Sequence, residues 1–413
     1  MKNSLFIIAF LLLGSSLFAQ TTWYEIPTGV SAELRAIDFP TSSVGYIVGY
    51  DSTILKTTDG GQTWSQLGLN GIVISSGDDD FTDVHFVDEN TGFIVSGYTG
   101  VWKTVDGAQS WSNVSAAMCF PYTVLPTSGT DYIIGGGDCF EGARLDVVSN
   151  SISSPATIST NFWDTQEIVV EMSFANSMLG LAAVRNQYML RTIDGGANWD
   201  TIPTNISGVH TSVVMVNDTL CYAGYDENGS GFGVLKSTDG GLTWIQDFNS
   251  ATFLYPAFLS VHAAGNGDIY AGAVPSTLPN GVIFEVEDGV NWNYTNVDQA
   301  INAMTSYGSD VTFGVGDSGY LVVNTPLAEL AVNHYTELDV TFYPNPVKNH
   351  LCVQNLKGST GQISIRDANG RLLLSKSISS NIETIDCSEL SSGVYFATIH
   401  QDNQHGTKKF IKE

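Results

Sequence analysis

A nine-residue segment recurs along the middle of the chain, and its spacing limits the possible folds more than any other feature. The copies KTTDGGQTW, KTVDGAQSW, RTIDGGANW and KSTDGGLTW begin at Lys56, Lys103, Arg191 and Lys236, and a degenerate copy, FEVEDGVNW, begins at Phe284. Their fourth positions, all acidic, are 47, 88, 45 and 48 residues apart, and 88 is twice 44. A period of about 45 residues is typical of a four-stranded propeller blade, so a further copy is expected within the long interval.

Each copy combines a tight turn with a packing anchor. Asp-Gly favours a turn because Gly tolerates positive φ, and the Asp carboxylate can accept hydrogen bonds from backbone N–H groups of its own turn. The Trp supplies a large apolar surface for packing between adjacent blades. We assign this structural role to Asp59, Trp64, Asp106, Trp111, Asp194, Trp199, Asp239, Trp244 and Trp292.

Each repeat unit contains an apolar segment, and together these segments predict seven inner strands. They are Gly45–Gly49, Gly92–Val95, Asp131–Gly135, Leu179–Ala183, Leu220–Gly224, Asp268–Gly272 and Val311–Gly316. Trp163 stands where the hidden copy is expected, but no Trp follows the seventh strand. Trp23, near the N-terminus, is therefore predicted to lie in the strand that completes the last blade and closes the ring. The pattern predicts an all-β fold, a seven-bladed β-propeller over residues 21–326.

The repeated segments resemble Asp-box (BNR) repeats, with the pattern S/T-x-D-x-G-x-x-W. The longer unit, from GYIVG to the Trp, is similar to propellers related to the photosystem II assembly and stability factor. This resemblance specifies a fold and leaves the function open. Sialidases also carry Asp boxes, but their F/Y-R-I-P motif is missing here, and Arg35, Arg144 and Arg185 alone make no recognisable arginine cluster.

The N-terminus reads as an export signal over residues 1–20. Lys2 precedes the unbroken apolar run Leu5–Leu13, and cleavage is expected after Ala19 or Gln20. The run is shorter than the roughly 20 residues that a membrane-spanning helix needs. We therefore expect a protein without a membrane span that leaves the cytoplasm.

Export would allow disulfides to persist. Cys119 and Cys139 are the tentative pair, because only twenty residues separate them. Cys352 and Cys387 form a weaker candidate pair, which leaves Cys221 alone. The alternative is that all five are small buried apolar residues.

The tail differs from the repeats and predicts a second domain at 341–413, after a linker at 327–340. Its alternating apolar pattern predicts a small immunoglobulin-like β-sandwich. Several motifs, in order, resemble the type A C-terminal sorting domain of the type IX secretion system of Bacteroidetes-type bacteria. The matching residues include Tyr343, Pro344, Asn345, Pro346, Gly393, Tyr395, Lys408 and Lys409. The resemblance implies transport across the outer membrane, with the secretion machinery as a partner, to the cell surface or the medium.

The net charge of the chain excludes some classes of function. The chain has a formal net charge of −26, and residues 21–337 hold 35 acidic but only seven basic residues. Such a surface argues against nucleic acid, whose phosphates need basic partners. The loop Asp226–Gly231 resembles a calcium loop but has Ser237 where a Glu is needed, so it reads as a polar hairpin.

Two functions stay open for the propeller. The first is a monomeric binding platform for an extracellular protein or glycan. The second is a secreted carbohydrate-active hydrolase that uses a carboxylate pair in the propeller centre. No spacing singles out a catalytic pair, a cofactor site or a metal site, so we expect none of the three.

Overall fold

The computed structural model describes residues 21–413 except 74–79, 98, 115–117, 119, 128–130, 139–141, 149–166, 207, 228–230, 250–258, 274–280, 287–290, 309, 331–339, 356–360, 368–371, 379–381, 389 and 402–403. The predicted signal peptide and Trp163 lie outside the described residues. The chain divides into two compact units, with the boundary between Pro326 and Leu327.

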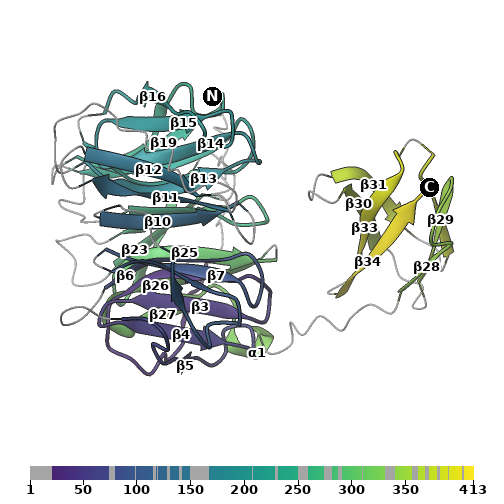
Figure 1. The fold of residues 1–413 in the computed structure, drawn as a ribbon, viewed down its shortest axis with the longest axis horizontal. Coiled ribbons are helices and arrows are strands. Elements are labelled where there is room, and N and C mark those ends of the chain that lie inside the picture. The colour runs from purple at the N-terminus through teal and green to yellow at the C-terminus, as the bar shows by residue number, and fades with distance from the viewer. Residues whose placement is uncertain are drawn as a thin grey trace, which may run out of the picture. The chain divides into compact units, whose positions relative to one another are not determined.

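The described residues of the first unit form seven antiparallel sheets, which we call blades 1 to 7. Figure 1 labels strands from each of them. Blade 1 contains β2 (Leu34–Asp38), β3 (Gly45–Gly49), β4 (Thr53–Thr57) and β5 (Ser65–Gln66). Blade 2 contains β6 (Phe81–Phe86), β7 (Gly92–Ser96), β8 (Gly100–Thr104) and β9 (Ser112–Asn113). The described part of blade 3 contains β10 (Phe120–Pro126), β11 (Tyr132–Asp138) and β12 (Gly142–Val148).

The next three blades repeat the four-stranded order. Blade 4 contains β13 (Val169–Phe174), β14 (Gly180–Val184), β15 (Tyr188–Thr192) and β16 (Asp200–Pro203). Blade 5 contains β17 (Val209–Met215), β18 (Cys221–Asp226), β19 (Phe232–Ser237) and β20 (Ile245–Asn249). Blade 6 contains β21 (Leu259–Ala263), β22 (Ile269–Ala273), β23 (Gly281–Val286) and β24 (Asn293–Val297).

Blade 7 joins the two ends of the first unit. Its strands β25 (Ile301–Tyr307), β26 (Val311–Gly316) and β27 (Leu321–Val323) come from the end of the unit, and η1 (Asp317–Gly319) connects the last two. The fourth strand is β1 (Tyr24–Glu25), which pairs with β27 through Tyr24 and Val323. Trp23, directly before β1, packs against the core between blades 6 and 7 and meets the Tyr270 ring edge-on at 5.6 Å. The first residues of the unit thus complete its last sheet.

The first strand of each blade lies innermost, and contacts between these strands close a ring. β2 packs against β6, and the contacts continue through β10, β13, β17, β21 and β25 back to β2. The prediction that the apolar segments are the inner strands is therefore wrong. Those segments form the second strands, such as β3 and β7, which are buried along their whole length. They are the most apolar because neighbouring blades cover both of their faces, whereas the first strands turn one face to the central channel.

The Asp boxes form one repeated hydrogen-bonded turn between the third and fourth strands. In blade 4, Thr192 Oγ1 donates to Asp194 Oδ1 at 2.9 Å and accepts from the Gly196 N–H at 2.9 Å. The Asn198 N–H donates to the same carboxylate oxygen at 2.8 Å. The boxes at Asp59, Asp106 and Asp239 repeat these contacts. In the box of blade 2, the Ser110 hydroxyl and N–H lower the pKa of Asp106 to about 2.

The box Trp closes the turn in three of these four blades. The indole N–H of Trp64, Trp199 and Trp244 donates to the carbonyl of the second box Gly at 3.0 to 3.1 Å. Trp111 is buried, but within the described part of the chain its indole N–H has no partner, and the position of the second box Gly is taken there by Ala108 at φ +69°. The degenerate box differs again, because Trp292 donates to Asp247 Oδ2 in blade 5 at 2.9 Å.

In three of the four boxes, a Gly lets the turn approach the preceding blade. Gly61 has φ +90°, and a Cβ there would lie 2.7 Å from the Phe313 ring of blade 7. Gly241 meets Leu181 of blade 4 in the same way, at 2.6 Å. Because any Cβ would collide with a packed apolar side chain, these positions need Gly for space as well as for φ.

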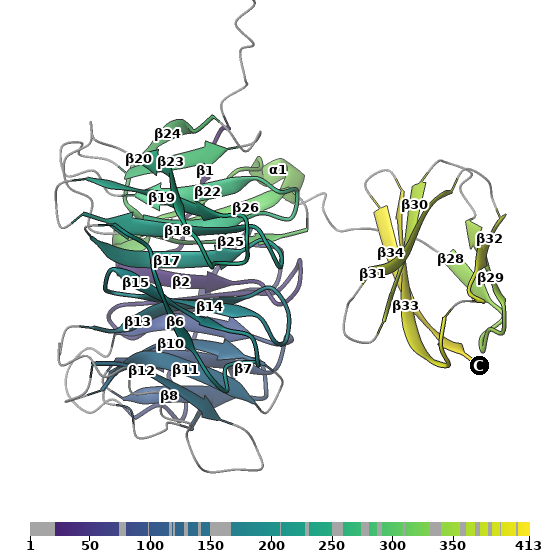
Figure 2. The ribbon, with the colours of Figure 1, turned by 90° about the horizontal axis from the view of Figure 1, so that it is seen from above.

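The second unit begins with α1 (Leu327–Leu330) and contains two facing sheets (Figure 2). One sheet holds β28 (Val340–Tyr343), β29 (His350–Asn355) and β32 (Ile382–Asp386). The other holds β30 (Gly361–Asp367), β31 (Leu372–Ile378), β33 (Gly393–Gln401) and β34 (Gln404–Lys412). Alternate apolar residues of both sheets, among them Leu351, Ile365 and Phe410, form one buried core.

The box hydroxyls can be tested by an isosteric substitution. We expect Thr192→Val to destabilise the propeller by about 1–3 kcal/mol, because the buried Gly196 N–H loses its acceptor. The matched control is Thr201→Val on the exposed position of β16, which should leave the free energy of unfolding almost unchanged. Chemical denaturation of both variants measures the difference, and equal effects would contradict a structural role for the box hydroxyl.

Candidate functional site

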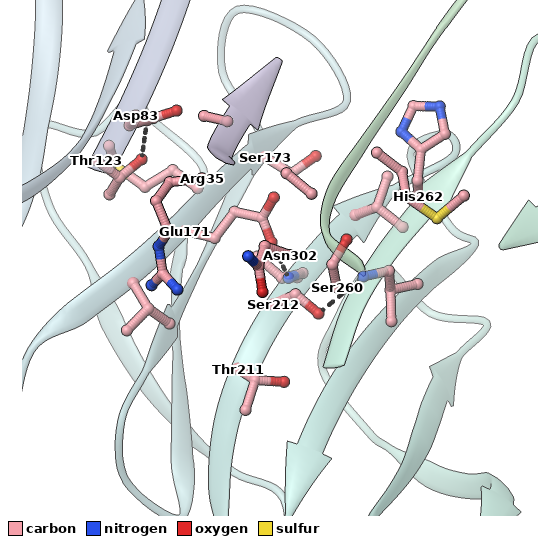
Figure 3. Close-up of a pocket in the computed structure, with 18 of the residues that line it drawn as sticks. Arg35, Asp83, Thr123, Glu171, Ser173, Thr211, Ser212, Ser260, His262 and Asn302 are labelled. Atoms are coloured by element: carbon pink, nitrogen blue, oxygen red, sulfur yellow. Dashed lines mark hydrogen bonds between the residues drawn. The ribbon is translucent and has the colours of Figure 1, made fainter. Parts of the chain in front are cut away.

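The innermost strands enclose a central channel with a cavity of about 190 Å³ (Figure 3). All seven first strands contribute to its lining, which is rich in hydroxyl, amide and carboxylate side chains. The polar lining residues are Arg35, Thr82, Asp83, Tyr122, Thr123, Glu171, Ser173, Thr211, Ser212, Ser260, His262 and Asn302. A cavity of this size is below the roughly 300 Å³ at which ordinary small-molecule pockets begin.

Most of the polar side chains in the channel bind the next blade. Asp83 Oδ2 of blade 2 accepts the Val124 N–H at 2.9 Å and the Thr123 hydroxyl at 2.8 Å, both from blade 3. Glu171 Oε2 of blade 4 accepts the Val213 N–H of blade 5 at 2.9 Å. The two channel carboxylates therefore satisfy backbone donors that the neighbouring strands leave unpaired.

Similar contacts recur around the ring. Asp38 Oδ2 accepts the Phe86 N–H at 2.6 Å between blades 1 and 2, and Ser212 Oγ accepts the Val261 N–H at 3.1 Å between blades 5 and 6. The Asn302 amide donates to the Leu34 carbonyl at 3.0 Å, which links blade 7 to blade 1. The channel lining is thus a set of bonds that hold successive blades in register.

Glu171 is neutral through most of the physiological pH range. Desolvation inside the channel raises the pKa of Glu171 to about 8, the Val213 N–H opposes this shift, and Asp83 adds to it. A protonated carboxyl keeps one acceptor for the N–H of Val213 and gains an O–H that can donate into the channel.

Two histidines, the buried His210 and the partly exposed His262, also belong to the framework. His262 lies with Nε2 2.8 Å from Ser306 Oγ of blade 7. His210 lies with Nδ1 2.7 Å from the Asn186 carbonyl of blade 4, which requires a proton on that nitrogen. Burial lowers the pKa of both imidazoles to about 4, so both are neutral at pH 7.

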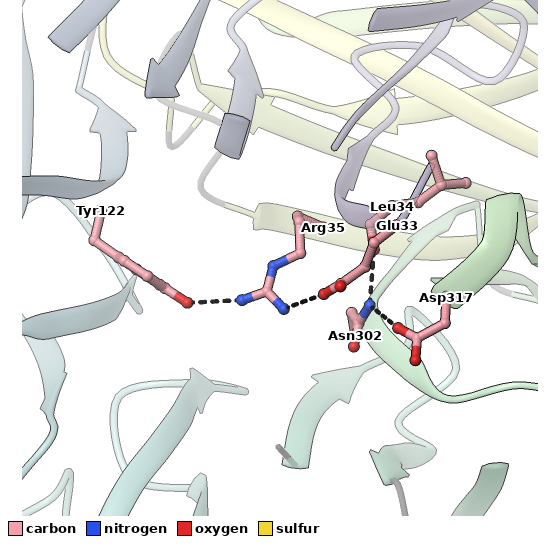
Figure 4. A network of polar contacts seen from close by, with 6 residues as sticks. All are labelled: Glu33, Leu34, Arg35, Tyr122, Asn302 and Asp317. Carbon is pink, nitrogen blue, oxygen red and sulfur yellow. Dashed lines mark hydrogen bonds and ion pairs between the residues drawn. The ribbon is translucent and has the colours of Figure 1, made fainter. Parts of the chain in front are cut away.

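A charged cluster lies where the innermost strands begin (Figure 4). The Arg35 guanidinium donates to Glu33 Oε1 at 2.7 Å and to the Tyr122 hydroxyl of blade 3 at 3.0 Å, and it lies 5.4 Å from the centre of the Tyr50 ring. Burial works against this charge, but Tyr122, Tyr50 and Glu33 together raise the pKa of Arg35. The cluster joins blades 1 and 3 with a permanently charged group.

Asn302 extends the cluster to blade 7. Its amide N–H₂ donates to the Leu34 carbonyl at 3.0 Å and to Asp317 Oδ1 at 3.1 Å (Figure 4). A cation, two phenols, an amide and two carboxylates thus stand close together. Such a set can recognise polar groups of a partner by directed hydrogen bonds.

The structure places the sequence-predicted Asp boxes away from this site, since no box residue lines the channel. In two of the boxes, the basic residue that opens the box instead reaches the next blade. Lys56 Nζ donates to the Gly107 carbonyl at 2.9 Å, and Arg191 Nε donates to the Gly240 carbonyl at 2.8 Å. These residues therefore contribute to the framework.

The tail motifs, distant in sequence, meet in the second unit. Asn345 accepts the Ile411 N–H at 2.9 Å through Oδ1 and donates to the Lys409 carbonyl at 3.4 Å. Tyr395 stacks on the Phe410 ring at 5.6 Å, and Gly393 pairs with Lys412. The Tyr343–Pro346 segment is thus tied to the terminal strand, which exposes Lys408 and Lys409.

Cys119 and Cys139 lie outside the described residues, so their pairing stays a prediction. The weaker candidate pair was wrong, because Cys352 and Cys387 are both free thiols. Cys387 is in the core, whereas Cys352 stands between the core residues Leu351 and Val353. Since side chains alternate along a strand, Cys352 faces away from that core.

Within the described residues, no group of three or more His, Cys, Asp or Glu side chains could hold a metal ion. The same part of the chain has no helix that is long and apolar enough to span a membrane.

Sequence reasoning missed the channel residues. Asp83 and Glu171 stand in the strand before each apolar segment, where polar and apolar residues alternate. This alternation could have identified them, because a strand that turns one face to a channel alternates polar and apolar residues. Arg35, by contrast, was noted only as an isolated arginine.

Comparison with known families yields two matches. Residues 16–115 match the family described as photosynthesis system II assembly factor YCF48. Residues 341–413 match the secretion system C-terminal sorting domain. The second match and the tail motifs agree, so the protein carries a sorting domain and is exported by type IX secretion to the cell surface or the medium. Among curated proteins, none matches the chain significantly.

Solved structures agree with the propeller fold. A YCF48 structure bound to D1 peptide has a TM-score of 0.57 at 17% identity and covers 74% of this chain and 96% of its own. YCF48 from Cyanidioschyzon merolae has a TM-score of 0.56 at 17% identity, with 73% and 98% covered. Virginiamycin B lyase from Staphylococcus aureus has a TM-score of 0.55 at 8% identity, with 73% and 98% covered. Since an assembly factor and a lyase share it, the fold alone leaves the function open.

The neutral state of Glu171 predicts a pH-dependent effect of Glu171→Gln. The unfolded carboxyl loses its proton above its ordinary pKa, whereas the folded one keeps it up to about pH 8. The wild type therefore loses stability as the pH rises through this window, by at most about 1.4 kcal/mol per pH unit. We expect Glu171→Gln, which carries no titrating carboxyl, to become progressively more stable than the wild type between pH 5 and pH 8.

Chemical denaturation at pH 5, 6.5 and 8 measures this difference. Glu89→Gln, at an exposed position, is the matched control and should show no such trend. A constant difference between Glu171→Gln and the wild type across the three pH values would contradict a raised pKa.

Proposed function

We propose that the propeller is a non-enzymatic binding platform, which the sorting domain delivers to the cell exterior for contact with a protein or glycan. The observation that carries this proposal is that both acidic side chains in the channel are hydrogen-bonded to the next blade. Asp83 and Glu171 each accept a backbone N–H of the next blade. Both are thereby committed to holding the ring together.

The alternative is a secreted hydrolase with a carboxylate pair in the centre, and the same contacts argue against it. A glycosidase needs one carboxylic acid and one carboxylate that face the scissile bond. Here the two lie in a cavity of about 190 Å³ and are bonded to the strands around them. A sugar residue would have to displace those bonds before it could reach either group.

The cluster around Arg35 is the part of the ring best suited to recognise a partner. It combines a charged guanidinium with the phenols of Tyr50 and Tyr122. Arginine and tyrosine are the residue types most often found at the energetic centre of protein interfaces. One structural neighbour of the same fold, YCF48, was solved with a bound peptide, which supports a peptide or protein as one partner class.

The proposed platform is tested by a binding screen. We expect the purified propeller to bind a member of a glycan array or a cell-surface protein, and Arg35→Gln to weaken that binding at least about tenfold, or 1.4 kcal/mol. Arg185→Gln, at an exposed arginine in the turn between β14 and β15, is the matched control and should bind normally. Thermal melting verifies that both variants are folded. Turnover of a glycan by the wild type, or equal affinities for the two variants, would contradict the proposal.

The role of the tail is tested by its removal. We expect a chain without residues 341–413 to form a folded propeller that stays in the periplasm, because the propeller has its own core and lacks the address. Cell fractionation with immunodetection measures location, and thermal melting of the retained protein measures folding. Release of the truncated chain to the medium at the normal level would contradict the assignment.

A further inference from the structure

Blade 6 carries a buried carboxylate at a position where four other blades carry a cation. Lys56, Lys103, Arg191 and Lys236 occupy equivalent places on the third strands, opposite the same position of the second strands. In blade 6 this place belongs to Glu285, which pairs with Tyr270. The charge at this position is therefore reversed in one blade.

The basic residues at this position link their own blade to the next one. Lys56 and Arg191 donate to carbonyl groups in the box turn of the following blade, Gly107 and Gly240. A carboxylate cannot donate in this way, so Glu285 needs a donor from blade 7 instead.

Blade 7 supplies a different partner because it has no box turn. Its outermost strand is β1, so the start of the described chain occupies the place where a box would stand. The Thr21 N–H donates to Glu285 Oε1 at 3.3 Å, and the Thr295 hydroxyl donates to the Thr21 carbonyl at 3.3 Å. The first described residue is thus held on both sides by blade 6.

Glu285 is left incompletely satisfied by these contacts. The residue is 2% exposed, and its second oxygen, Oε2, is buried and has no hydrogen-bond partner among the described residues. A buried carboxylate is stable only when a counter-charge and further donors compensate its lost hydration. One additional cationic donor near Thr21 would supply both.

We propose that Glu285 is the docking site for the amino terminus that removal of the signal peptide creates. The inference goes beyond the binding platform and rests on the predicted cleavage after Ala19 or Gln20. In that step, water adds across the peptide bond, the released peptide keeps the carboxyl group, and the mature chain keeps an amine that takes up a proton. The new ammonium lies on Thr21 itself or one residue before it.

An ammonium fits the geometry better than the peptide N–H it replaces. It carries a positive charge at neutral pH and offers three donors, enough for both oxygens of Glu285. The ion pair would hold β1 against blade 6 next to its pairing with β27. Completion of the ring is thereby coupled to processing of the exported chain.

The first test identifies the terminus. Intact mass of the exported protein should give a free amine on Thr21 or Gln20, and labelling of that amine should be several-fold slower in the folded wild type than in Glu285→Gln. A terminus beyond Trp23, a blocked or cyclised Gln20, or equal labelling rates would overturn the proposal.

The second test is a double-mutant cycle on mature chains that begin at Thr21. We expect a Gly-Ser extension before Thr21 to lower the melting temperature of the wild type by more than it lowers that of Glu285→Gln. Glu89→Gln is the matched control and should respond to the extension like the wild type. Equal losses in all three backgrounds would overturn the ion pair. If Glu285→Gln does not fold, the labelling rate of the wild type decides alone, by comparison with the same chain in denaturant.

Discussion

The pairing of β1 with β27 is the contact on which the rest of the propeller depends. It joins Tyr24 to Val323 and Glu25 to Val322, so that residues about 300 positions apart complete one sheet. Without β1, β27 would present an unpaired edge. The position of Glu285 beside the start of this strand suggests that closure is secured at the neighbouring blade as well.

Side-chain hydrogen bonds link successive blades, whereas backbone hydrogen bonds link the strands inside each blade. Successive first strands are not hydrogen-bonded sheet neighbours, and several of their backbone N–H groups bond to Asp, Glu or Ser side chains of the preceding blade. Buried N–H groups need such partners. This explains why Asp and Glu side chains stand near the axis of the ring.

In the sorting domain, motifs that are distant in the sequence contact one another. Its motifs are separated by about 50 to 65 residues, yet Asn345 bonds to both Lys409 and Ile411 on the terminal strand. These contacts bring the separate motifs together in one folded domain. Lys408 and Lys409 are exposed on its surface.

The sequence by itself determined the all-β class, the repeat, the turn chemistry of the Asp boxes and the identity of the tail. These features depend on local rules, because Asp-Gly turns, box Trp residues and alternating strands act over a few residues. It also indicated that the N-terminal strand would complete the last blade, because the seventh repeat lacked its fourth strand.

Only the tertiary structure decided which strands line the axis and what their side chains bind. The apolar segments were assigned to the inside, but Ile47 and Val48 are buried between blades, while the mixed strand with Asp83 faces the channel. Arg35, Glu171 and Glu285 each have a hydrogen-bond partner on another blade, at sequence distances that vary from tens to hundreds of residues. No local pattern encodes such contacts, because they arise only when the ring has closed.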